Sequence, residues 1–145
     1  MAPAIPKSRE EVLDREYDWL ACDSNGNVAL FSTAGAGYAP AEFLRDTEAH
    51  DNAINALLDL PATTDVRFAP ALAFGLINTW KLVAERGLYA YDCDPNGGPY
   101  RLVAAPRVAT TVDALPASVA DVVRGIRCAC TFDGYDVVMA EVVGA

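Results

Sequence analysis

The dipeptide Asn25-Gly26 stands between two apolar stretches, Tyr17–Asp23 and Asn27–Thr33. Asn-Gly in such a place is the strongest short signal for a β-hairpin. A two-residue turn would leave both faces of this hairpin largely apolar, so we expect it to be covered on both sides, or covered on one and open to a partner on the other. The predicted cross-strand pairs are Leu20 with Phe31 and Cys22 with Ala29.

Two further strand pairs are joined by turn residues, and helix signals stand between the pairs. The predicted pairs are Leu88–Cys93 with Tyr100–Ala104 and Arg127–Phe132 with Asp136–Val143. The predicted main helices cover residues 40–58, 76–86 and 116–125, after a short capped helix at Ser8–Arg15. The remaining segments are predicted as a loop at 61–75 and a short strand at Val108–Val112.

These elements predict an α+β fold, with an antiparallel sheet of three hairpins and three main helices packed on it. With 145 residues and 52% hydrophobic residues, the chain can bury one core without a disulfide or a metal. We therefore expect a single domain over residues 1–145, with residues 1–7 flexible. No signal peptide or membrane span is recognisable, so we expect a cytoplasmic protein whose four cysteines are reduced core residues.

Negative charge is concentrated in the first part of the chain. The net charge is −9, and the stretch from Glu10 to Asp59 holds eleven acids and two bases, while the remaining acids and bases balance. This distribution disfavours nucleic acid and anionic membranes as partners and favours a basic protein. The alternative is that the acids only keep the surface solvated.

The sequence contains no strong catalytic motif. His50 is the only histidine, and no G-x-S-x-G pattern accompanies it. The Gly35–Tyr38 loop follows a predicted strand, but it lacks the third glycine of a dinucleotide-binding loop and the lysine of a phosphate-binding loop. A small enzyme or small-ligand-binding protein of unknown substrate, built on His50 and this loop, remains the alternative to a binding protein.

Two patterns have the residue types of a metal site without its spacing. Cys128-Ala-Cys130 is not accompanied by a second pair or by histidines, as structural zinc would require. Asp23–Asn27 begins like a calcium loop, but Val28 and Ala34 occupy the positions that need glycine and glutamate. We therefore expect no metal and no cofactor.

A partner-binding surface is predicted from acids on the first long helix and from tyrosines on the strands. Acids steer a cationic partner, and half-exposed tyrosines are typical of the residues that provide most of the affinity. A homo-oligomer is also possible on such a surface. The candidate contact residues are Glu42, Asp46, Glu48, Asp51, Tyr38, Tyr89, Tyr91 and Tyr100.

Two stretches carry a resemblance to known proteins: residues 17–38, YDWLACDSNGNVALFSTAGAGY, and Asn78-Thr-Trp80 followed by GLYAYDCDPNGGPY. They resemble small uncharacterised bacterial proteins, and their style is similar to that of immunity proteins from bacterial polymorphic toxin systems. The resemblance covers most of the chain as a type and not as a motif. It implies a small, acidic, cytoplasmic α+β protein that blocks a toxin by occupying its surface.

Overall fold

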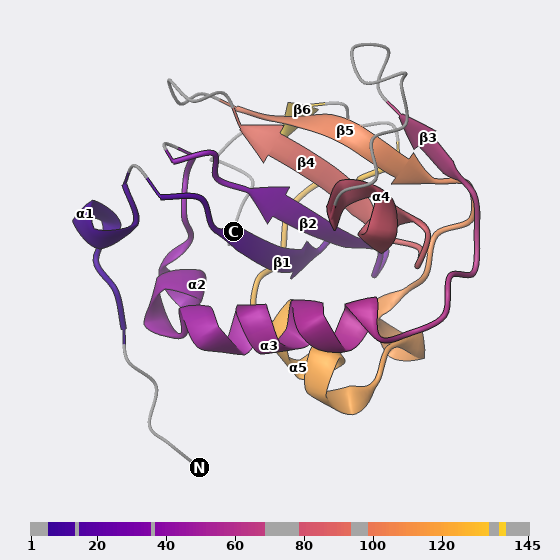
Figure 1. Cartoon of the computed structure of the whole chain (residues 1–145), viewed down its shortest axis with the longest axis horizontal. Coiled ribbons are helices and arrows are strands. Elements are labelled where there is room, and N and C mark those ends of the chain that lie inside the picture. Colours follow the sequence, from indigo (N-terminus) through magenta and orange to yellow (C-terminus); the bar gives the residue numbers. More distant parts are fainter. Residues whose placement is uncertain are drawn as a thin grey trace.

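The structure is a computed structural model, and it describes residues 6–13, 15–35, 37–68, 79–93, 99–133 and 137–138. Within these ranges the strands form one sheet in the order β1-β2-β4-β5-β3, and β6 pairs with β5 (Figure 1). This arrangement confirms the α+β class. The strands are β1 (Asp18–Cys22), β2 (Val28–Ser32), β3 (Val66–Phe68), β4 (Tyr89–Cys93), β5 (Tyr100–Pro106) and β6 (Val137–Val138).

The sheet is mixed, so the prediction of a wholly antiparallel sheet is wrong. β2 and β4 run parallel, with Leu30 opposite Ala90 and Ser32 opposite Asp92. A parallel pair needs a long crossover, and the chain between these strands supplies it with helices and β3. Turn residues within a hairpin carry no information on how that hairpin is joined to the next one.

The first hairpin forms, but its register differs by one residue from the prediction. Leu20 lies opposite Leu30, and Cys22 opposite Val28. The N–H of Asp23 donates to the carbonyl of Asn27 at 3.0 Å, so the loop holds three residues and not two. Within it only Gly26 has a positive φ, of 80°, which fits a three-residue loop and not the two-residue turn with two such residues.

The second hairpin is confirmed: β4 and β5 are antiparallel, with a bulge between Ala90 and Tyr91. β5 continues to Pro106, and its last residues pair with β3, which lies inside the predicted loop 61–75. The predicted strand Val108–Val112 is wrong. The chain there forms one isolated bridge, from Thr111 to Asn27, and then the 3-10 helix η2 (Val112–Ala114).

The third hairpin is also wrong. Residues 126–132, which we call the return segment, form a parallel bridge with Cys22, the last residue of β1, while β6 pairs with β5. The N–H of Cys22 donates to the carbonyl of Ile126 at 3.0 Å, and the N–H of Cys128 donates to the carbonyl of Cys22 at 2.8 Å. An edge strand needs such partners, and turn signals alone do not reveal which strand a segment will join. Residues 136 and 139–143 of this prediction lie outside the described residues.

The helices are close to those predicted, except that the first long helix is divided. The side chain of Asp46 accepts a hydrogen bond from the N–H of Ala49 at 3.1 Å and begins a new helix there. Ser8 and Glu11 cap the first helix reciprocally, as predicted, but it ends before Arg15. Residues 76–78 lie outside the described part of the chain. The helices are α1 (Arg9–Val12), α2 (Ala41–Arg45), α3 (Thr47–Leu58), α4 (Thr79–Ala84) and α5 (Ala117–Arg124).

Each face of the sheet has its own core. Helices α3, α4 and α5 cover the face that carries Leu20, Leu30 and Ala90. The opposite face carries aromatic residues and packs against the return segment, α2 and Val12 of α1. Its largest buried side chains are Trp19, Phe31, Tyr91, Tyr100, Phe43 and Phe132.

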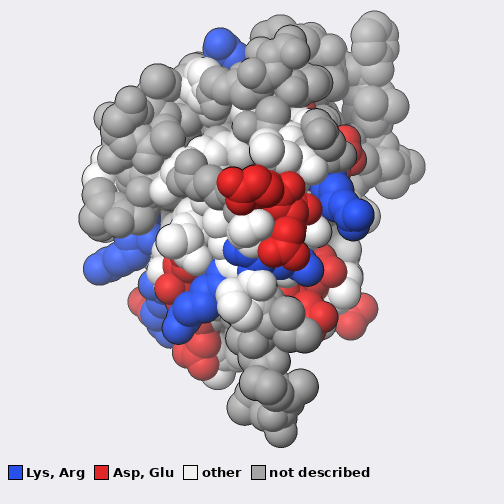
Figure 2. Space-filling view, turned by 90° about the vertical axis from the view of Figure 1, so that its left-hand side faces the viewer, with Lys and Arg blue, Asp and Glu red and all other residues white. Residues whose placement is uncertain are grey.

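Charges of both signs lie on the side of the molecule that carries α1 and α2 (Figure 2). Glu10 and Glu11 of α1 are exposed, and Arg45 of α2 forms an ion pair with Glu42. The excess of acids in the first part of the sequence therefore does not produce a uniformly negative surface on this side.

Candidate functional site

An open cleft of about 530 Å³ lies where the parallel strands β2 and β4 end and where β1 begins. Carboxyl ends of parallel strands are a common place for ligand sites. The described lining residues include three acids and no lysine or arginine. We call this site the acidic cleft, and its described lining residues are Glu16, Asp18, Ser32, Ala34, Thr79, Trp80, Asp92 and Cys93.

A polar row across three strands forms the floor of the acidic cleft. Asp18 of β1 lies opposite Ser32 of β2, and Ser32 lies opposite Asp92 of β4. Residues paired in this way point to the same face of the sheet. The next row on that face, Leu20, Leu30 and Ala90, is wholly buried under the helices. The polar row therefore marks the point where the helical cover ends.

Two hydrogen bonds fix the centre of this row. The indole Nε1–H of Trp80 donates to Oγ of Ser32 at 3.0 Å, and the Ser32 hydroxyl donates to Oδ1 of Asp18 at 2.6 Å. No hydrogen bond reaches Oδ2 of Asp18 from the residues that the structure describes. Since no buried side-chain oxygen among those residues lacks a partner, Oδ2 must be accessible to solvent.

The electrostatics of Asp18 connect the cleft to α3. Burial raises the pKa of Asp18, the Ser32 hydrogen bond lowers it, and the negative charges of Asp51 and Glu16 raise it again. Asp51 is exposed on α3, so acids from two elements act on the same carboxyl group. A positive charge at this point would relieve both the burial cost and the repulsion.

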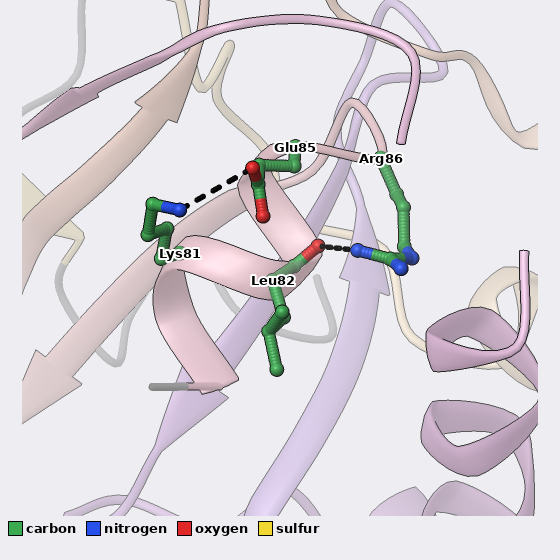
Figure 3. Close-up of polar contacts among 4 residues, drawn as sticks. All are labelled: Lys81, Leu82, Glu85 and Arg86. Carbon is green, nitrogen blue, oxygen red and sulfur yellow. Dashed lines mark hydrogen bonds and ion pairs between the residues drawn. The ribbon is translucent and has the colours of Figure 1, made fainter. Parts of the chain in front are cut away.

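Helix α4, which carries Trp80, is held in place by its own polar contacts (Figure 3). The ammonium of Lys81 lies 3.4 Å from Oε2 of Glu85, and the guanidinium of Arg86 donates to the carbonyl of Leu82 at 2.7 Å. Arg86 also donates to the carbonyl of Leu60 at 2.8 Å. The contact with Leu60 ties the segment that follows α4 to the residues just beyond α3, and Lys81 pairs with Glu85, the residue that follows α4.

The four predicted acids of the first long helix divide into two kinds. Glu42 pairs with Arg45, and Asp46 caps α3, so both already have structural partners. Glu48 and Asp51 are exposed. Of the four, Asp51 is the one whose charge reaches Asp18 in the acidic cleft.

The strand tyrosines are not half-exposed as predicted. Tyr91 is 0% exposed, Tyr100 2% and Tyr89 5%, because they lie on the aromatic face that the return segment covers. The hydroxyl of Tyr100 accepts from Nε1 of Trp19 at 3.2 Å and donates to the carbonyl of Tyr38 at 2.7 Å. Of the four tyrosines, Tyr38 is the one that is half-buried and not buried.

His50 has a structural environment. It is 3% exposed, its Nδ1 accepts a hydrogen bond from the N–H of Leu20 at 3.0 Å, and its ring packs edge-on against Phe43. Burial lowers its pKa to about 4, although Asp46 and Glu42 oppose that shift. His50 borders a hollow of about 200 Å³, and the described part of the Gly35–Tyr38 loop borders a different one of about 130 Å³. The two parts of the predicted catalytic site therefore do not share a pocket.

The cysteines and Asp23 also have structural surroundings. All four thiols are buried and free, and burial raises the pKa of Cys128 strongly and that of Cys130 to about 11. The carboxylate of Asp23 accepts from the N–H groups of Asn25 and Asn27, each at 2.9 Å, and of Phe132 at 2.7 Å. Within the described ranges, no group of three His, Cys, Asp or Glu residues is placed to hold a metal ion.

The acidic cleft was not predicted from the sequence because its residues are far apart along the chain. The available signal was a polar residue at or beside one end of each of three apolar strands: Asp18 at the start of β1, Ser32 at the end of β2 and Asp92 next to the end of β4. Such residues form one site only if their strands are neighbours in the sheet. That adjacency depends on the parallel pairing of β2 with β4, which the sequence did not predict.

Comparison with protein-family models, with curated protein sequences and with solved structures found no match to this chain. In the part of the chain that the structure describes, no helix has the length and apolar character needed to cross a membrane. The function must therefore be argued from the site itself.

Proposed function

We propose that this protein is a non-catalytic binding domain for a basic protein, acting as an immunity protein that neutralises a bacterial toxin. The observation that supports this proposal is the acidic cleft, in which Glu16, Asp18 and Asp92 meet without a described lysine or arginine in the lining. A toxin that acts in the cytoplasm would be met there, so we place the protein in that compartment.

The proposed interface extends from the acidic cleft onto the exposed side of α3. Glu48 and Asp51 would attract a cationic partner before contact and so raise the association rate. Trp80 and Tyr38, which are both partly exposed, replace the buried strand tyrosines as the aromatic candidates for close contact. Inhibition would follow from covering the basic surface of the partner, and no chemical step is needed.

A pull-down from the native cell, run at low and high salt, tests this proposal. The protein should retain a specific basic partner at low salt and release it as ions screen the acids. The Asp18→Asn and Asp51→Asn variants should retain less of it. Asp133→Asn, an equal change of charge at an exposed residue outside the cleft lining, should behave like the wild type. Retention of no protein by the wild type at low salt would refute the proposal.

A further inference from the structure

We propose that the hollow beside His50 receives a main-chain carbonyl of the basic partner, with the Nε2–H group of His50 as the hydrogen-bond donor. This inference rests on the proposed function and adds a contact outside the acidic cleft. The hollow, of about 200 Å³, lies between α3 and α5, which pack against each other (Figure 1). Ala49 and His50 line it from α3, and Asp121 and Val122 line it from α5.

The ring of His50 has a defined position for its proton. Its Nδ1 accepts the backbone N–H of Leu20 at 3.0 Å, so the proton of the neutral ring must be on Nε2. Burial lowers the pKa of His50 to about 4, so the ring is neutral at pH 7. Nε2 is therefore a donor. A metal ion on Nε2 would move the proton to Nδ1 and break the bond to Leu20, so a hydrogen-bond acceptor is the ligand that suits this ring.

This donor has no partner within the described ranges of the chain. His50 is 3% exposed, and its printed hydrogen bond, to Leu20, uses only Nδ1. Since no fully buried side-chain nitrogen or oxygen among the described residues lacks a partner, Nε2 must keep some contact with solvent. The side chain lines the hollow, so we infer that the Nε2–H group is aimed into it. Buried donors are normally paired, which makes an open one a place for an acceptor from outside.

The charges around the hollow decide which acceptor fits. Glu42 and Asp46 act electrostatically on the His50 ring, and Glu42 forms an ion pair with Arg45. Asp121 is exposed at the opposite wall. The described lining thus holds three acids and one base. A carboxylate or phosphate would be repelled there, and an acceptor without negative charge is favoured.

A main-chain carbonyl of a protein meets these requirements, because it is a strong acceptor with no net charge. The segment that carries it can bring a lysine or arginine towards Asp121, whereas an acid on that segment would be repelled. Helix α3 also carries Glu48 and Asp51, which are exposed. The hollow and the acids that attract the partner in the proposed function are therefore on the same helix.

The test follows His50 by NMR in the full-length protein, since the chain has one histidine. A long-range nitrogen–proton spectrum first shows which ring nitrogen carries the proton, and it should be Nε2. Three probes are then added at low salt and pH 7. They are the N-acetyl methylamide of lysine, the N-acetyl methylamide of glutamate, and butylammonium, which has the charge of the lysine side chain and no carbonyl.

We expect the lysine probe to shift the Nε2 signal in a saturable way at concentrations up to about 100 mM. The glutamate probe should bind about two- to fivefold more weakly, because exposed charges contribute modestly to affinity. Butylammonium should leave the Nε2 signal in place, because it offers no acceptor.

A pair of variants tests the position of the contact. Ala49→Leu places a larger side chain in the hollow and leaves His50 unchanged, so the shift caused by the lysine probe should be lost. Ala56→Leu is the same change on α3 outside the described lining, and it should leave the shift intact. The backbone N–H signal of Leu20 shows whether each variant keeps the bond to His50.

Five results would overturn the inference: a proton on Nδ1 in the free protein, an Nε2 signal that the lysine probe does not move, an equal shift with butylammonium, tighter binding of the glutamate probe, or unchanged binding by Ala49→Leu. The wild-type results decide the question even if Ala49→Leu does not fold. In the pull-down, a basic partner retained equally by wild type and Ala49→Leu would overturn this contact and leave the binding function standing. Binding of the lysine probe with no protein retained would overturn the protein partner, and this inference with it.

Discussion

Nδ1 of His50, on α3, accepts a hydrogen bond from the backbone N–H of Leu20, on the outer edge of β1. The bond requires the neutral imidazole, because a protonated ring nitrogen cannot accept. Helix and strand are thus joined through a titratable group that is 3% exposed. The stability of the fold must depend on the protonation state of this ring.

The first prediction concerns acid. The pKa of His50 falls from 6.5 to about 4 on folding, so the unfolded chain takes up the proton more readily. Neutral His50 makes its full contribution to the free energy of unfolding above pH 6.5. That contribution, roughly 3 kcal/mol, is lost as the pH falls from 6.5 to 4. Urea unfolding at pH 7 and at pH 4.5 measures this loss.

His50→Gln provides the control for that experiment. Glutamine offers a side-chain oxygen to the N–H of Leu20 and does not titrate in this range. The variant should therefore lose less stability than the wild type between the two pH values. Equal losses in both proteins would show that the carboxylates, and not His50, cause the acid sensitivity.

The second prediction is that the acidic cleft lowers stability. The pKa of Asp18 is raised in the folded protein, so its ionised form disfavours folding at neutral pH. Asp18 contributes most to stability below pH 3.8, which is the pKa of its carboxyl group in the unfolded chain. This contribution is lost as the pH rises through the higher pKa of the folded state. Asp18→Asn keeps an acceptor for the Ser32 hydroxyl and should raise the urea midpoint at pH 7.

That gain should disappear at low pH, where Asp18 is protonated. Asp133→Asn, at an exposed position, should change the midpoint little at either pH. A lower midpoint for Asp18→Asn at pH 7 would contradict the prediction, since it would mean that the ionised carboxylate stabilises the fold.

The third prediction compares two glycines with positive φ, Gly26 at 80° and Gly87 at 95°. A Cβ at Gly26 would make only an ordinary contact with Val112, so Gly26→Ala should cost ~1–2 kcal/mol for the backbone conformation alone. A Cβ at Gly87 would overlap the side chain of Thr110 and lie 2.7 Å from its backbone nitrogen. Gly87→Ala should therefore cost roughly 1–3 kcal/mol more.

Thermal and urea unfolding of the two alanine variants measure this difference. Both variants carry the same change of side chain and the same type of backbone strain, so the difference isolates the overlap with Thr110. Equal destabilisation would indicate that the loop around Thr110 moves aside without cost.

Local chemistry explains which parts of this fold could be predicted from the sequence. The reciprocal cap of Ser8 and Glu11 and the hairpin around Asn25-Gly26 depend on residues close together in the chain, and both form. The register of that hairpin was missed because the Asp23 carboxylate binds the N–H groups of Asn25 and Asn27 and favours the longer loop. A shift of one residue in the pairing of two strands moves the side chains of one strand to the opposite face of the sheet.

The acidic cleft and the path of the return segment could not be predicted in the same way. The cleft brings together Asp18, Ser32 and Asp92 because β2 and β4 are parallel neighbours. That pairing depends on how the crossover helices pack on the sheet, and no local sequence signal indicates it. The burial of Tyr91 and Tyr100 likewise depends on cover from the return segment. Alternation within a strand shows that two side chains share a face, but not whether that face is covered.

The return segment also sets an order of events during synthesis. It occupies the outer N–H of Cys22 through Ile126, and these two residues are 104 positions apart. At ~5–20 residues per second, β1 leaves the ribosome roughly 5–20 seconds before the segment that protects its edge. In that interval the unprotected strand can pair with another chain. A shortage of chaperones should therefore reduce the yield of this protein, because the nascent chain exposes an end of β1 that the return segment pairs in the finished fold.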